Sequence, residues 1–264
     1  MTVNPKLNSQ NRFIKTIKQS LGRDENSTRD ASLFFADKSS PEPQRCLERI
    51  ANRTMAARQE LLDRLIEASR TINMNVSINK DLASVGSAIV RLVAEKEPEW
   101  GNRKEVVAWR HPLVERLNLT AALEAPGVPV YFTDLNPKPA DGKDNKSDCE
   151  TVRKQVIDSY IGVTSADFCM ADTASLVLRT RIGEARSVSL LPSIHVAVIK
   201  ESQIIADMKE LFALIKYDPK TGPQGLTNCM TFISGPSKTA DIEAQMVFGA
   251  HGPRELYLYI LSGV

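Results

Sequence analysis

The stretch from Phe232 to Glu243 gathers polar side chains beside a probable turn, directly after an apolar run. Gly235 and Pro236 break the run, and a helix is expected over residues 239–248. The first N–H groups of a helix are unpaired and attract anions. The predicted ligand-binding residues here are Ser234, Gly235, Ser237, Lys238, Thr239 and Asp241.

Asp241 is favoured over Glu243 as a ligand contact, because the two residues would lie roughly 200° apart around a regular helix. A purely structural interpretation stays open, in which Ser237 caps the helix and Asp241 complements its dipole.

Two aspartates, Asp167 and Asp172, lie between apolar segments of strand length and are the catalytic candidates. Burial would raise the pKa of such a carboxyl group and a nearby cation would lower it, so either could carry a proton or act as a nucleophile. Thr173 and His195 are further candidate ligand contacts. The structural alternatives are that Asp167 forms a turn, Asp172 faces solvent and His195 is a satisfied core residue.

The cysteines and histidines show no metal-binding pattern. Cys46, Cys149, Cys169 and Cys229 contain no Cys-x-x-Cys pair, and the three histidines are equally scattered. We therefore expect this chain to bind no metal and no iron–sulfur cluster through local sequence, although a metal site assembled from distant residues stays open.

Composition and charge argue against a nucleic-acid-binding, exported or membrane-spanning protein. The 264 residues include 34 basic and 32 acidic side chains, and a net charge of +2 indicates no nucleic-acid partner. The first residues lack the apolar core of a secretory signal, and no apolar run approaches about 18 residues. These features predict a cytoplasmic protein without a membrane span.

The chain divides by pattern into a helical arm, residues 1–70, and an α/β domain, residues 71–264. Polar residues and two prolines predict a linker around 23–45. Strand-like segments in the domain are 74–78, 105–109, 128–133, 161–164, 176–181, 195–200, 230–234 and 256–261. Helix-like segments are 81–95, 112–119, 147–159, 202–216 and 239–248. Their alternation predicts a mostly parallel open sheet covered by helices.

Five ordered motifs resemble the lactate-utilization (LUD-domain) family, and most closely its C-type subunit. They are Gly162-Val163-Thr164-x-Ala166-Asp167-Phe168, Ala171-Asp172-Thr173, Leu191-Pro192-x-x-His195-x-x-Val198, the run from Ile233 to Glu243, and Gly249-x-His251-Gly252-Pro253. The resemblance covers roughly residues 70–264 and is strongest after Tyr160. It implies a fold similar to the sugar-phosphate isomerase, CoA-transferase and formyltetrahydrofolate cyclo-ligase group.

The resemblance also implies a role in a multi-subunit system that oxidises L-lactate to pyruvate. In that system iron–sulfur clusters belong to partner subunits, and this chain, which lacks their cysteines, is expected to be the non-redox, cluster-free component. The family commonly has Glu-Thr-Gly-Thr where this chain has Asp172-Thr173-Ala174-Ser175. The shorter acid argues against a covalent acyl-carboxylate mechanism.

Three hypotheses follow. The leading one is a cluster-free subunit that binds a small anionic ligand at the 234–241 turn, with Asp167 and Asp172 lining the same cleft. The alternative is a free-standing transferase or ligase for an acyl or phosphorylated substrate, with Asp172 as nucleophile and Lys238 as phosphate contact. The third is a scaffold whose N-terminal arm docks a partner.

Overall fold

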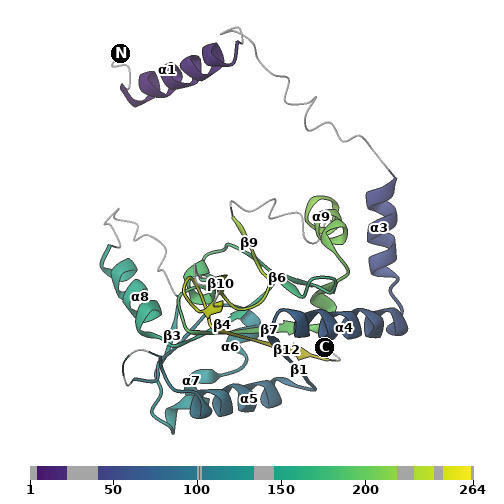
Figure 1. Cartoon of the computed structure of the whole chain (residues 1–264), viewed down its shortest axis with the longest axis vertical. Helices are drawn as coiled ribbons and strands as arrows, with labels where there is room; N and C mark the ends of the chain where they lie inside the picture. The colour runs from purple at the N-terminus through teal and green to yellow at the C-terminus, as the bar shows by residue number, and fades with distance from the viewer. Residues whose placement is uncertain are drawn as a thin grey trace. The chain divides into compact units, whose positions relative to one another are not determined.

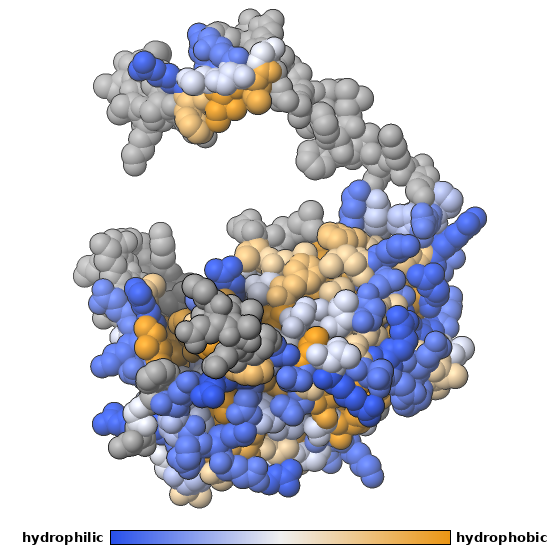
Figure 2. All heavy atoms as spheres, in the orientation of Figure 1, coloured by the Kyte–Doolittle hydropathy of each residue, from blue (hydrophilic) through white to orange (hydrophobic). Residues whose placement is uncertain are grey.

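The computed structural model describes residues 5–22, 41–99, 101, 103–133, 146–218, 229–240 and 246–262. The chain forms two compact units, Met1–Glu42 and Pro43–Val264. The first contains helix α1 (Pro5–Ser20), on which Phe13, Ile14 and Ile17 are exposed. Figure 2 shows these apolar side chains as a band along one side of α1.

A six-stranded sheet forms the centre of the second unit, in the order β1-β12-β7-β4-β2-β3. All five strand pairings in it are parallel. The strands are β1 (Met74–Asn79), β2 (Val106–Ala108), β3 (Val130–Phe132), β4 (Ile161–Ser165), β7 (Ile194–Lys200) and β12 (Glu255–Leu261). This sheet confirms the predicted α/β class with mostly parallel strands.

The path of the chain through the sheet reverses between β2 and β4, which are neighbours. After β2 the chain continues to β3 at one edge, whereas after β4 it continues to β7 and β12 in the other direction. Crossovers that leave in opposite directions open a crevice at the carboxyl ends of the two strands, where open α/β sheets bind ligands.

Helices cover both faces of the sheet (Figure 1). Side chains of alternating strand residues pack on one face with α5 (Leu82–Glu95), α6 (Pro112–Glu115) and α7 (Leu119–Glu124). The other face packs against α4 (Met55–Thr71), through Leu61, Leu62 and Leu65, and against α8 (Lys146–Asp158). Helix α3 (Glu42–Ala51) precedes α4. The predicted domain boundary near residue 70 stays a prediction.

A second sheet, in the order β8-β5-β6-β9, lies beside the parallel one. Its strands are β5 (Phe168–Met170), β6 (Ser175–Arg179), β8 (Ile204–Ile205) and β9 (Met230–Ile233), and α9 (Met208–Tyr217) packs on it. Two short 3-10 helices, η1 (Arg186–Ser189) and η2 (Glu201–Gln203), flank β7.

Three of the predicted helices differ in the structure. The segment 202–216 begins as η2 and β8 before α9, and the segment 112–119 is divided between α6 and α7. The helix predicted over 239–248 is wrong, because β10 (Lys238–Ala240) pairs antiparallel with β11 (Met246–Phe248). The β-branched pair Thr239 and Val247 lies opposite in this hairpin, and such cross-strand pairing overrides local helix preference.

Within the described residues, no helix combines the length and apolar character required to cross a membrane.

Candidate functional site

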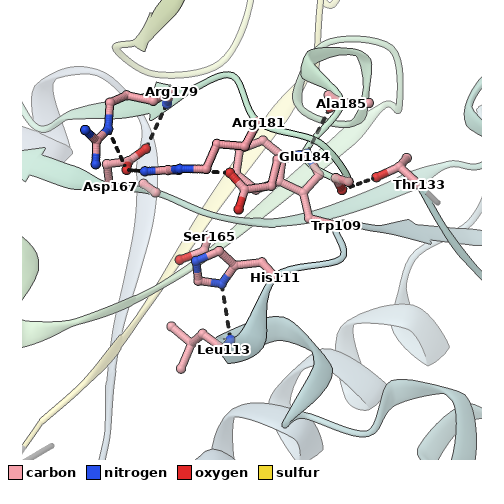
Figure 3. Close-up of polar contacts among 12 residues, drawn as sticks. Trp109, His111, Leu113, Thr133, Ser165, Asp167, Arg179, Arg181, Glu184 and Ala185 are labelled. Carbon is pink, nitrogen blue, oxygen red and sulfur yellow. Dashed lines mark hydrogen bonds and ion pairs between the residues drawn. The ribbon is translucent and has the colours of Figure 1, made fainter. Parts of the chain in front are cut away.

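A pocket of about 200 Å³ opens at the carboxyl ends of β2 and β4, where the path of the chain reverses. We call it the switch-point pocket. Figure 3 shows most of its polar side chains, which come from the last residue of β4, from the segments after β2 and β4, and from the turn after β6. Gln203, from η2, also lines the pocket. Its lining residues are Trp109, His111, Pro112, Ser165, Ala166, Asp167, Arg181, Glu184 and Gln203.

The segment after β2 supplies Trp109 and His111. The indole Nε1–H of Trp109 donates to the carbonyl of Ala185 at 2.8 Å, and this side chain is buried. His111 caps α6, and its Nδ1 accepts the backbone N–H of Leu113 at 3.2 Å. Because Nδ1 is an acceptor, the neutral ring carries its proton on Nε2.

Burial, followed by the charge of Arg181, lowers the pKa of His111, although Asp167 and Glu115 act in the opposite direction. His111 is therefore a neutral hydrogen-bond donor at pH 7. In Figure 3 its ring lies beside Ser165, below the pair formed by Asp167 and Arg181.

Asp167 follows β4 and is the most heavily hydrogen-bonded acid of the pocket. Its side chain is 7% exposed, and it accepts the backbone N–H of Arg179 at 2.8 Å and the Nε–H of Arg179 at 2.9 Å. Arg181 Nη2 donates to the same carboxylate. Burial alone would raise the pKa of Asp167, but these hydrogen bonds and charges outweigh it and lower the pKa.

The turn after β6 brings Arg181 and Glu184 to the pocket. Arg181 Nη1 donates to Glu184 Oε2 at 3.0 Å, and burial raises the pKa of Glu184. The turn is anchored to the main sheet, because the carbonyl of Gly183 accepts the hydroxyl of Thr133 at 2.6 Å and the backbone N–H of Arg110 at 3.0 Å.

Asp172 lies at the opposite end of the β5–β6 hairpin from Asp167, so the expected common cleft of the two acids is not formed. Asp172 is exposed, and its carboxylate accepts the hydroxyl of Thr173 at 3.2 Å. Ser175 connects this group to Ser234, with an oxygen–oxygen distance of 2.5 Å. The structure therefore brings Asp172, Thr173 and Ser234 together and places Asp167 elsewhere.

The turn from Ser234 to Thr239 carries no helix N-terminus, which corrects the basis of the predicted anion site. Gly235 has a φ of 91°, and the N–H of Ser237 is already bonded to the carbonyl of Pro253 at 2.8 Å. Lys238 is exposed, with Nζ 5.9 Å from the centre of the Phe248 ring. Thr239 belongs to β10, and Asp241 lies outside the described residues.

His195 is a core residue of β7, 1% exposed. Its Nε2 lies 2.7 Å from the hydroxyl oxygen of Thr164, whereas Nδ1 is buried without a hydrogen-bond partner among the described residues. Burial lowers the pKa of His195 to about 3, so the ring is neutral at pH 7. It does not line the switch-point pocket.

Four residues that line the pocket were not among the site residues predicted from sequence: Trp109, His111, Arg181 and Glu184. Trp109 and His111 end or directly follow a predicted strand, which is the position where α/β sheets place functional side chains. Arg181 and Glu184 belong to the turn after β6. Which residues lie beside this turn depends on the order of the strands, which could not be predicted from the sequence. Across the described residues, no group of three or more His, Cys, Asp and Glu side chains could hold a metal ion.

Comparisons with known proteins agree with the sequence motifs. The model of the LUD domain family matches residues 62–261. A protein of Shouchella clausii named "Lactate utilization protein C" is 32% identical over 67% of this chain and 71% of its own length. A relative of the same name from Halalkalibacterium halodurans is 31% identical over 60% of this chain and 63% of its own length.

Among solved structures, a crystal structure of a DUF162 family protein from Deinococcus radiodurans matches with a TM-score of 0.47 and 19% identity. The match covers 78% of this chain and 98% of that chain. The family model accounts for most of the second compact unit, from α4 to the last strand of the parallel sheet. The chain therefore belongs to the LUD domain family.

Proposed function

We propose that the protein acts in lactate utilization as a cluster-free component, and that it binds a small carboxylate ligand in the switch-point pocket. The family and the name "Lactate utilization protein C" of its relatives support the first part. The second part depends on one observation, the position of a charged pocket at the reversal point of a parallel sheet.

The pocket has the chemistry for a small acid. Arg181 lines it with a side chain that is 28% exposed, and guanidinium groups bind carboxylates through parallel N–H donors. His111 adds a neutral Nε2–H donor for a hydroxyl or carbonyl oxygen. A volume of about 200 Å³ suits a metabolite of the size of lactate or pyruvate. The pocket thus replaces the 234–241 turn as the proposed ligand site.

The cluster-free part of the proposal rests on the spacing of the cysteines along the chain. Cys46, Cys149, Cys169 and Cys229 contain no Cys-x-x-Cys pair. We propose that electron transfer takes place in iron–sulfur partner subunits and that this chain supplies ligand binding.

Isothermal titration calorimetry of the full chain with L-lactate and with pyruvate tests the ligand site. We expect binding of at least one of the two acids, and a loss of tenfold or more in affinity in Arg181→Gln, because a charged hydrogen bond is removed. Arg70→Gln is the matched control, since Arg70 also pairs with an acid three residues away but lies on the exposed face of α4.

His111→Asn provides a second variant in case Arg181→Gln does not fold. It should also weaken binding, and circular dichroism should show an unchanged fold. If wild-type protein binds neither acid, or if both pocket variants bind as tightly as the wild type, the proposed site is wrong.

A further inference from the structure

We propose that the switch-point pocket takes up its carboxylate ligand together with one proton, and that Glu184 holds this proton. The inference rests on the proposed function, since it requires a carboxylate in this pocket. It assigns to Glu184 a direct role in ligand binding, as the group that is protonated when the ligand binds.

Among the described residues, the charges around the pocket are balanced before a ligand binds. Two carboxylates, Asp167 and Glu184, face two guanidinium groups, Arg179 and Arg181. Nearby, Glu115 pairs with Arg110 at 3.2 Å, and this pair adds no net charge. Both acidic side chains are 7% exposed, so little water screens them. A ligand carboxylate would add a third negative charge to two positive ones, and an unbalanced charge at a buried site is costly. One proton restores the balance.

Glu184 is the acid that accepts the proton most easily. Asp167 accepts three N–H groups from two arginines, which stabilise its ionised form. Glu184 accepts one hydrogen bond, from Arg181 Nη1, in the described part of the chain. Burial also raises the pKa of Glu184, whereas the pKa of Asp167 is lowered.

His111 is the other group that could take a proton, and its hydrogen bond opposes this. Its Nε2 already carries a proton, so the second would have to enter at Nδ1, which accepts the N–H of Leu113. Protonation of His111 would therefore break the cap of α6 and place a cation beside Arg181. Protonation of Glu184 affects one hydrogen bond, the one from Arg181 Nη1, and Arg181 exchanges this bond for one to the ligand carboxylate.

The proposed exchange is simple in chemical terms. Arg181 turns from Glu184 toward the ligand carboxylate, Glu184 takes one proton from solvent, and its new O–H donates to a ligand oxygen. The only covalent bond formed is this O–H bond, and no group is oxidised or reduced.

Calorimetric titrations of L-lactate and pyruvate, in buffers of different ionisation enthalpy, measure the protons taken up on binding. We expect close to one proton per ligand in wild-type protein, and a Kd that rises about tenfold per pH unit where free Glu184 is ionised. Glu184→Gln should bind without proton uptake and with a Kd that does not change with pH. Glu67→Gln, in the exposed pair with Arg70, should behave as the wild type.

The outcomes separate this inference from the proposed function. Binding without proton uptake in wild-type protein overturns the inference alone. Uptake that persists in Glu184→Gln and disappears in His111→Asn overturns it as well, because the proton then resides on His111. Absence of binding by both acids overturns the proposed function and the inference together. If Glu184→Gln does not fold, the change of the wild-type Kd with pH still tests whether a proton is taken up with the ligand.

Discussion

Asp167 joins the end of β4 to strand β6 through its contacts with Arg179 and Arg181. We predict that Asp167→Asn lowers the free energy of unfolding by about 3 kcal/mol, because removal of one partner leaves buried arginine charge without its acid. Urea denaturation measures this change. Asp63→Asn, on the exposed side of α4, is the control and should change stability by less than about 0.5 kcal/mol.

The effect of Asp167 also has a defined pH dependence. The folded pKa of Asp167 lies below its unfolded value, so the stabilisation is present above an unfolded pKa of about 3.9 and is lost as pH falls through the folded pKa. The stability difference between wild type and Asp167→Asn should therefore shrink in acid. A difference that stays constant from pH 7 to pH 3 would contradict this assignment.

His195 gives a second prediction at the level of single residues. Its pKa is lowered by burial to about 3, so the unfolded chain, with a pKa of about 6.5, binds the proton more readily. Stability is fully present above pH 6.5 and should fall by roughly 1.4 kcal/mol per pH unit below it. His195→Gln should reduce this slope, while the exposed His251→Gln should not.

The pKa of His111 is also lowered in the folded protein, so His111 also makes the stability fall as the pH falls. Part of the pH slope of stability should therefore remain in His195→Gln. Chemical denaturation at several pH values between 7 and 5 provides the measurement. An identical slope in wild type and His195→Gln would show that the ring is protonated in the folded protein.

The turn between β9 and β10 depends on a glycine that no other residue can replace without strain. Gly235 has a φ of 91°, and a Cβ atom there would lie 2.7 Å from the carbonyl oxygen of Ile72. We predict that Gly235→Ala destabilises the protein by about 2 kcal/mol, through both the backbone conformation and the contact.

Gly127→Ala separates the two contributions, because Gly127 has a φ of 70° with no atom within 4 Å of an added Cβ. Gly127→Ala should lower the free energy of unfolding only through the backbone conformation, by about 1 kcal/mol. Equal losses in the two variants, measured by thermal unfolding, would mean that the contact with Ile72 adds nothing.

The central strands of the parallel sheet could be predicted from sequence because they are short apolar runs with polar boundaries, whereas β1 alternates apolar and polar residues. The run from Ile194 to Ile199, for example, is buried at every position, as expected for a central parallel strand. The β10–β11 hairpin could not be predicted, since residues such as Ala240 and Glu243 favour a helix locally and the pairing partner of Thr239 appears only in the folded chain.

At the scale of the whole molecule, the candidate site depends on strand order, which the sequence does not contain. Asp167 was a candidate because it follows an apolar segment, and it does line the pocket. His111 and Glu184, however, are 73 residues apart in sequence (184 minus 111) and meet only because β2 and β4 are neighbours and the turn after β6 folds over them. Five local motifs indicated the family but could not show this meeting point.

The proposal places ligand binding in this chain and electron transfer in its partner subunits, and an activity measurement tests this separation. The purified chain should not oxidise L-lactate with an artificial electron acceptor, because electron transfer is assigned to iron–sulfur partner subunits. Addition of such subunits should produce activity, and Arg181→Gln in the assembled system should reduce it by tenfold or more while Arg70→Gln leaves it unchanged. Substantial oxidation by the chain alone would show that it is itself the oxidising enzyme.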